Sequence, residues 1–218
     1  FATKMAKRGY VVAVVQYRRG WNPFGDALTQ QRTILHASYR GIQDLRTAVR
    51  YFRKSEAEDG DPYGVDGTKI AVGGTGTGAY MSYGATYLDS YEQTLIDKFI
   101  DFNTTPPTPF LDTTLFGNPT GTDVATWNIP NHPTYSSDFN MGFAMGGAIG
   151  DGSWIQADDV PFVAIHSYED PFAPFRVGDV IAADPTTMPP SPFAVIPTAA
   201  GGYACLLYTS DAADEWLR

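Results

Sequence analysis

The sequence has a single cysteine, Cys205, among its 218 residues. One cysteine cannot form a disulfide within the chain or build a multi-thiolate metal site, and it leaves the redox compartment open. Basic residues are also scarce, since 15 Lys and Arg stand against 24 Asp and Glu, a net charge of −9 with neutral histidines. An acidic chain without a Lys/Arg cluster repels phosphate backbones, so no nucleic-acid partner is expected. No apolar run approaches the roughly 20 residues that a membrane helix needs, so no membrane span is expected.

The sequence has enough hydrophobic residues to form a packed core. Hydrophobic residues make up 43% of the chain and aromatic residues 14%, whereas a disordered chain is poorer in both. The length suits one domain of ordinary size. We therefore predict a single domain over residues 1–204.

The two ends of the sequence indicate a fragment. Residue 1 is Phe, and FATKMAKRGY reads as the end of a helix leading into a strand. We expect truncation there, so a signal peptide is not testable, and localisation, including export from a bacterial cell, is left unknown. The segment Cys205–Arg218 resembles the translated sequencing-adapter read-through that ends metagenomic gene fragments, so residues 205–218 are expected to be an artefactual tail; the alternative is a genuine helix capped by Ser210.

Apolar runs rich in β-branched residues predict the strands. Tyr10–Tyr17 (YVVAVVQY) is the longest such run, and its unbroken apolar character is typical of a central strand buried on both faces of a parallel sheet. Further strands are expected at Lys69–Gly74, Met141–Gly150, Val160–Ser167 and Phe193–Pro197.

A long helical pattern runs from about Gln30 to Ala57, and a second helix is expected over residues 77–89. Strand, crossover helix and strand form a βαβ unit, which predicts an α/β fold with a mostly parallel sheet and flanking helices. The 3.6-residue period of the long helix places one set of side chains on a buried face and another toward solvent. The buried set is Ile34, Ile42, Leu45, Val49 and Phe52, and the solvent set is Arg40, Asp44, Arg46, Arg50 and Arg53.

Residues 101–138 form a long stretch rich in Pro, Thr, Asn and Gly. Aromatic residues recur through it, which distinguishes it from a linker. Long ordered insertions of this kind often serve as lids or binding loops. We therefore predict an irregular, lid-like insertion at about 101–138.

The stretch KIAVGGTGTGAY, residues 69–80, reads as a strand, a tight Gly-rich turn and a helix start. A phosphate-binding P-loop needs Lys after the second glycine, but Ala79 follows Gly78. A dinucleotide-binding turn fits Gly74–Ala79, but it also needs an acidic residue ending the next strand, and none is evident. The third interpretation is the nucleophile elbow, G-x-S-x-G, with Gly76 at the serine position.

Three segments together resemble α/β-hydrolase fold esterases and lipases. They are YGVDGTKIAVGGTGTGAY around the elbow, RGIQDLRTAVRYFRK before it, and VPFVAIHSYEDPFAPF after it, in the order that the superfamily has them. The resemblance covers about Ala2 to Phe175 without the insertion. It implies carboxylic-ester hydrolysis by a serine, a histidine, an aspartate and backbone oxyanion donors, with no cofactor and no metal.

The resemblance assigns site residues by position. Asp170 matches the acid of the triad, Gly76 stands at the vacant nucleophile position, and the backbone N–H of Thr77 matches one oxyanion donor. Gly74, Thr75 and Gly78 complete the elbow. The second oxyanion donor is expected before Phe1, and the catalytic histidine after the last strand. This sequence therefore lacks the nucleophile and the base.

Substitutes for the missing groups are weak. Thr75 and Thr77 are displaced from the elbow position, and the hydroxyl of Thr77 suits local capping of N–H groups. The histidines His36, His132 and His166 lie on a helix, in a loop and at a strand end, the last in a structural role by the resemblance. The stretch Asp59–Ile70 lacks the carboxylates of a calcium loop.

Two functions therefore stay open from the sequence. The first is an esterase/lipase-like hydrolase that is inactive as this fragment. The second is a non-catalytic relative that binds a small ester or carbohydrate-like ligand in the same pocket. An NAD-dependent oxidoreductase is a weaker third. Loop aromatics, among them Trp127, are expected to pack in the core or to line a pocket over the carboxyl edge of the sheet.

Overall fold

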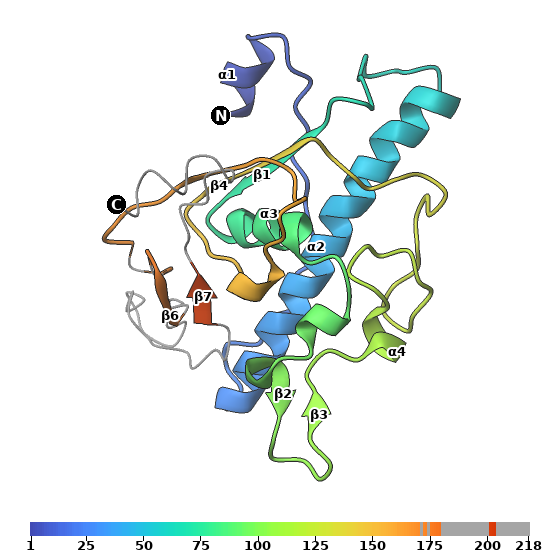
Figure 1. Cartoon of the computed structure of the whole chain (residues 1–218). Helices are drawn as coiled ribbons and strands as arrows, with labels where there is room; N and C mark the ends of the chain where they lie inside the picture. Colours follow the sequence, from blue (N-terminus) through green and yellow to red (C-terminus); the bar gives the residue numbers. More distant parts are fainter. Residues whose placement is uncertain (171, 174, 180–200, 204–218) are drawn as a thin grey trace.

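A computed structural model describes residues 1–170, 172–173, 175–179 and 201–203 (Figure 1). The strand predicted at Phe193–Pro197 and the tail 205–218 lie outside the described residues. The α-helices are α1 (Ala2–Ala6), α2 (Ala27–Glu58), α3 (Thr77–Tyr87) and α4 (Thr113–Phe116), and the 3-10 helices are η1 (Glu92–Thr94), η2 (Asp97–Phe99) and η3 (Gly152–Trp154). The strands are β1 (Ala71–Thr75), β2 (Ile100–Asp101), β3 (Thr108–Pro109), β4 (Met141–Met145), β5 (Phe162–Ile165), β6 (Val177–Asp179) and β7 (Gly201–Tyr203).

The main sheet has three parallel strands in the order β1-β4-β5. Ala71 pairs with Met141 at its start, and Met145 pairs with Ile165 at the other end. Two antiparallel pairs, β2-β3 and β6-β7, stand outside this sheet. Helices combined with a small, mostly parallel sheet make the fold α/β, as predicted. The strands predicted around Lys69–Gly74, Met141–Gly150 and Val160–Ser167 are confirmed as β1, β4 and β5.

The strand predicted at Tyr10–Tyr17 is wrong. The segment belongs to no strand, and Val14 is 85% exposed. β-Branched side chains suit a pleated, half-buried surface, but a strand exists only where a neighbour supplies ladder hydrogen bonds. No strand within the described residues pairs with this segment. The parallel connection observed is therefore β1 to β4, with α3 following β1 directly.

Helix α2 confirms the long predicted helix and extends it at both ends. It begins after Asp26, whose side chain accepts a hydrogen bond from the Thr29 N–H, a standard N-cap. Ile42 and Val49 are buried in the core, as predicted. The predicted solvent side is wrong for two residues, because Arg46 and Arg50 are buried.

The buried arginines are explained by what lies over them. Arg50 is fully buried and donates to the carbonyl oxygens of Thr120, Gly121 and Asn131, all in the insertion. Arg46 donates to the carbonyl oxygens of Ala85 and Leu88 at the end of α3. A guanidinium carries five donors, so both side chains satisfy carbonyls that would otherwise be buried without partners.

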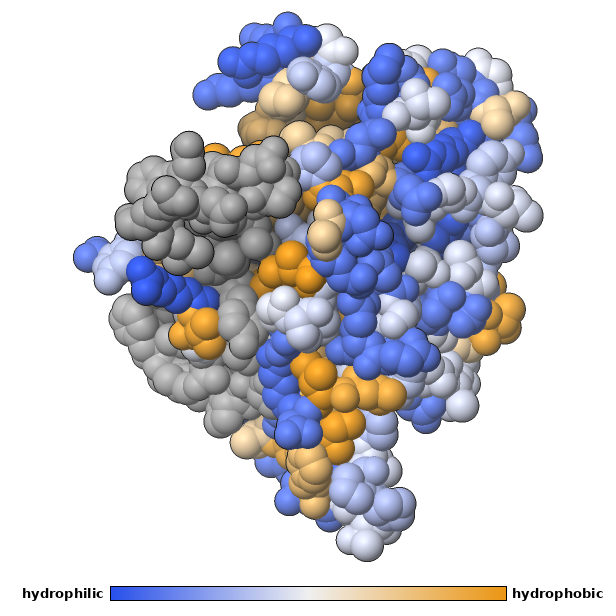
Figure 2. Space-filling view, in the orientation of Figure 1, coloured by the Kyte–Doolittle hydropathy of each residue, from blue (hydrophilic) through white to orange (hydrophobic). Residues whose placement is uncertain are grey.

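Helix α3 packs between the sheet and α2, as Figure 1 shows. Its Tyr83 stacks on Phe162 of β5 with ring centroids 4.7 Å apart. Val72, Ala144 and Phe162 are buried on the sheet face beneath α3, whereas on the opposite face of β5 Ile165 is 66% exposed. The core of the described chain therefore lies between one face of the sheet, α3 and α2. The face of the molecule seen in Figure 2 is hydrophilic over much of its coloured surface, with separate apolar patches between.

Candidate functional site

The turn between β1 and α3 has the shape of an elbow. Gly76 is the N-cap of α3, with φ 56° and ψ −121°, a conformation that side-chain-bearing residues rarely adopt. Its N–H donates to the carbonyl of Met145 on β4 at 3.1 Å, which ties the turn to the neighbouring strand. Among the described residues other than its two chain neighbours, a Cβ added at Gly76 would meet no atom within 4 Å. Within this part of the chain, a side chain at position 76 would therefore project into open space at the end of the sheet.

Gly74 explains why strand and helix can lie so close. A Cβ at this position would stand 2.0 Å from the carbonyl oxygen of Gly78 and 2.6 Å from the N of Ala79. Both are backbone atoms, so no side-chain adjustment could relieve the clash. At Gly78 an added Cβ would meet nothing within 4 Å outside the helix's own backbone. The close approach of β1 and α3 thus depends on Gly74 and not on Gly78.

The two threonines of the turn are not placed as nucleophiles. The hydroxyl of Thr77 accepts a hydrogen bond from the hydroxyl of Tyr17 at 2.8 Å, rather than capping a local N–H. Thr75 is the last residue of β1 and pairs with Met145. The Thr77 backbone N–H is in the first turn of α3, where N–H groups have no intrahelical acceptor and the helix dipole favours negative charge.

Asp170 lies at the same edge of the sheet as Gly76. It follows β5, and its Oδ1 accepts the N–H groups of Phe172 and Ala173 at 2.8 and 3.0 Å. Its Oδ2 lies close to Gly146, the residue after β4: a Cβ added to Gly146 would be 3.4 Å from this oxygen. Neighbouring strands lie about 4.8 Å apart, so the ends of β1 and β5 are roughly 10 Å apart. Gly76 and Asp170 therefore flank the end of β4, with Gly146 between them.

Each of the three histidines contacts another part of the fold. His36 on α2 bonds through Nε2 to the carbonyl of Phe110 at 2.7 Å, and burial lowers its pKa from 6.5. The ring of His132, a loop residue, lies 6.0 Å from that of Tyr51. His166 Nε2 lies 3.2 Å from the Ala173 carbonyl, and because a carbonyl only accepts, this nitrogen donates. Each ring thus has a structural contact.

His166 nevertheless faces the predicted acid. Its Nδ1 lies 3.9 Å from Asp170 Oδ2, and the His166 side chain is only 4% exposed. This Nδ1 is buried without a hydrogen-bond partner among the described residues. The sequence placed His166 at a strand end but gave no indication that it lies against Asp170. The spacing of four residues across a tight loop is the signal that could have suggested it.

Tyr80 is a further polar group at this edge that sequence reasoning missed. Its hydroxyl is buried without a hydrogen-bond partner within the described part of the chain. Burial, and after it the charge of Asp170, raise the pKa of Tyr80 above its usual range, so the phenol stays neutral and can donate. Its place four residues after Gly76, one helical turn below the elbow, is the pattern that could have identified it.

The insertion 101–138 is fastened to α2. Tyr39 and Gln43 of α2 donate to the carbonyls of Gly117 and Phe116, and Arg50 adds the bonds described above. The helix α4 and the loops beside it lie along α2 in Figure 1. This segment therefore forms a wall against α2, and Trp127 lines a cavity there rather than one at the sheet edge.

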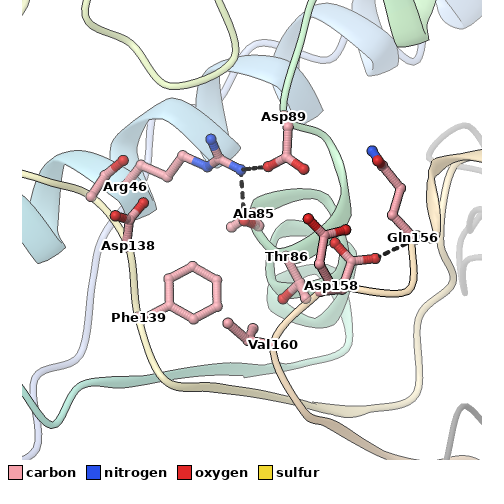
Figure 3. A pocket seen from close by; sticks show the side chains of 11 residues that line it. Arg46, Ala85, Thr86, Asp89, Asp138, Phe139, Gln156, Asp158 and Val160 are labelled. Carbon is pink, nitrogen blue, oxygen red and sulfur yellow. Dashed lines mark hydrogen bonds and ion pairs between the residues drawn. The ribbon is translucent and has the colours of Figure 1, made fainter. Parts of the chain in front are cut away.

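A second cavity, of about 220 Å³, lies beside the end of α3 (Figure 3). It is lined by one buried cation, Arg46, and by the carboxylates of Asp89, Asp138, Asp158 and Asp159. Burial, and then the charges of Asp89 and Asp158, raise the pKa of Asp159. Asp158 is exposed and Asp159 is half-buried in the turn before β5, and both residues line this cavity.

Other kinds of site find little support in the described residues. No cluster of three or more His, Cys, Asp or Glu side chains there could hold a metal ion. None of the described helices is long and apolar enough to cross a bilayer. The parallel strand after α3 is β4, which ends at Met145 and is followed by Gly146, so the acidic residue that a dinucleotide site requires is not at that strand end.

Comparison with known proteins adds no assignment, since no family model, no curated protein and no solved structure matches this chain.

Proposed function

We propose that this chain is an α/β-hydrolase-type domain of the esterase/lipase-like kind whose nucleophile position is vacant. The observation that carries the proposal is the backbone of Gly76, which bends sharply between β1 and α3 with open space where a side chain would project. In a serine hydrolase this position carries the attacking hydroxyl. Glycine has no side chain, so the acyl-enzyme route has no first step in this chain.

The position of Asp170, across the end of β4 from Gly76, also supports the proposal. Its carboxylate is oriented by two backbone N–H groups and lies at the sheet edge that holds Gly76. An aspartate in a triad acts by orienting a histidine and stabilising the imidazolium. His166 donates through Nε2 to Ala173, so it is not oriented as the base that would link Asp170 to position 76.

Binding without cleavage is the second candidate function. It is favoured by the open space above Gly76 together with the N–H groups of the first turn of α3, which suit a carbonyl or carboxylate oxygen. An ester-like ligand at this edge would then be held but not hydrolysed. The insertion, which is fastened to α2, would act as a fixed wall rather than as a closing lid.

The test uses the full chain and Gly76→Ser. A fluorophosphonate probe should leave the wild type unlabelled, and hydrolysis of p-nitrophenyl butyrate should not exceed that of a denatured sample. Gly76→Ser alone should stay inactive because it lacks a base. Added imidazole should accelerate hydrolysis by Gly76→Ser more than by the wild type, and Gly76→Ser/Asp170→Asn should lose that gain. Labelling of the wild type, or rescue that does not depend on Asp170, would contradict the proposal.

A further inference from the structure

A pocket separate from the elbow lies between α2 and the insertion. It has a volume of about 400 Å³, within the range of roughly 300–1,000 Å³ of small-molecule sites. We call it the Trp127 pocket. The lining residues used in the argument are Arg18, Asp44, Trp127, Asn128, Ile129 and Asn131.

The charges of this pocket cancel one another. Arg18 Nε and a terminal guanidinium nitrogen each lie 2.8 Å from Asp44 Oδ1. The backbone N–H of Arg18 donates to Asp44 Oδ2 at 2.7 Å. A further guanidinium N–H of Arg18 donates to the Trp127 carbonyl at 2.8 Å. This fork-like pairing fixes both side chains and leaves no uncompensated charge between them. A neutral ligand therefore suits this surface better than a phosphate or a polycation.

The pocket also has an apolar wall of fixed orientation. Trp127 is 46% exposed. Its ring packs edge-on against Phe116 at a centroid distance of 5.0 Å and in a tilted arrangement against His36 at 6.1 Å. Ile129 is 80% exposed beside it. An indole offers an apolar face and one N–H donor, so the wall can contact C–H groups and still donate a hydrogen bond.

Amide groups complete the lining. Asn128 is 4% exposed, and its Nδ2 donates to the carbonyl of Asp123 at 2.8 Å, which orients the side chain. Asn131 donates to the Ile129 carbonyl at 3.3 Å. Each amide keeps a carbonyl oxygen that accepts up to two hydrogen bonds. Two amide side chains thus line the same pocket as a half-exposed aromatic ring.

We propose that the Trp127 pocket binds a neutral sugar ring. Such a ligand presents both an apolar face of C–H groups, for Trp127, and several hydroxyls that donate and accept at once, for Asp44, Asn128 and Asn131. The internal pairing of Arg18 and Asp44 disfavours charged ligands of either sign. The proposal is independent of the vacant elbow, because none of the lining residues belongs to the sheet edge.

The experiment is saturation-transfer NMR followed by titration of the full chain with the methyl glycosides of glucose, galactose, mannose and N-acetylglucosamine. We expect at least one of them to bind with a dissociation constant of about 1 mM or lower. Trp127→Ala should weaken that binding about tenfold, because the apolar contact is lost. Trp127→Phe should weaken it less, since a ring remains.

Tyr168→Ala is the matched control, because Tyr168 is an aromatic residue that is 80% exposed and lies outside the pocket. It should bind the same glycoside as the wild type does. Asn131→Ala tests the polar lining on an exposed residue, and thermal melts of all variants show which remain folded. The inference is overturned when none of the four glycosides binds the wild type, or when folded Trp127→Ala and Trp127→Phe bind as well as the wild type.

Discussion

Alanine substitution at the three glycines of the elbow tests its geometry directly. Gly74, Gly76 and Gly78 are spaced two residues apart, yet their surroundings differ. Among the described residues, an added Cβ would meet a backbone atom 2.0 Å away at Gly74, whereas at Gly76 and at Gly78 it would meet nothing within 4 Å beyond the adjoining backbone. Only Gly76 has a positive φ, of 56°. The same chemical change should therefore give three different changes in the free energy of unfolding.

For Gly74→Ala we expect a loss of about 3–5 kcal/mol, because strand β1 and helix α3 must separate to admit the methyl group. For Gly76→Ala the cost is backbone strain alone, about 1–3 kcal/mol. For Gly78→Ala, inside the first turn of α3, we expect a gain of about 0.4–1 kcal/mol, since alanine restricts the unfolded chain and favours helix.

The assay is urea unfolding followed by circular dichroism, with the slope of each transition compared to check that the variants unfold alike. The order Gly78→Ala, wild type, Gly76→Ala, Gly74→Ala, from most to least stable, is the expected result. A Gly74→Ala variant that costs less than Gly76→Ala would refute the close approach of strand and helix. A Gly76→Ala variant as stable as the wild type would refute the left-handed bend on which the vacant-nucleophile proposal depends.

Three further changes test the packing and the pH response. Arg50→Met should cost about 3–5 kcal/mol in urea unfolding, because the carbonyls of Thr120, Gly121 and Asn131 lose their donor; an unchanged midpoint would contradict the buried role of Arg50. Burial lowers the pKa of His36 from 6.5, so the unfolded chain binds the proton more readily and stability should fall as pH drops below 6.5. His36→Gln should flatten that fall in melts across the pH range, and equal slopes for both proteins would count against it. Burial, and then Asp89 and Asp158, raise the pKa of Asp159 above 3.8, so its ionisation destabilises the fold as pH rises through that region. Asp159→Asn should have a higher melting temperature than the wild type at neutral pH but not in acid. A lower melting temperature at neutral pH would show that the charge of Asp159 does not destabilise the fold.

Local pattern was sufficient for the elements whose identity depends on neighbours in sequence. The period of α2 and the apolar runs of β1, β4 and β5 were predicted, because burial on one face imposes its period on the residues themselves. The Gly-rich turn was predicted for the same reason. The conformation at Gly76 is a property of a few consecutive residues, and glycine is the residue that adopts it without steric cost.

The sequence likewise predicted only the part of the candidate site that depends on local pattern. The sequence alone predicted that the turn at Gly76 and the loop of Asp170 would both follow parallel strands, and carboxyl ends of parallel strands meet at one edge. It did not predict that His166 Nδ1 and the hydroxyl of Tyr80 would be buried near that carboxylate with no hydrogen-bond partner among the described residues. Which side chains face one another at an edge depends on loop conformations and not on strand order.

By itself, then, the sequence determined the α/β class, the helix α2, the three parallel strands and the glycine bend at position 76. Only the tertiary structure decided that Tyr10–Tyr17 forms no strand, that Arg46 and Arg50 are buried, and that the insertion packs on α2. Each of these depends on partners distant in the sequence: Arg50, for example, binds the carbonyl of Asn131, 81 residues away. A strand needs a neighbouring strand, and a buried charged group needs hydrogen-bond partners, and both can come from distant parts of the chain. The periodicity of the local sequence contains no information about such partners.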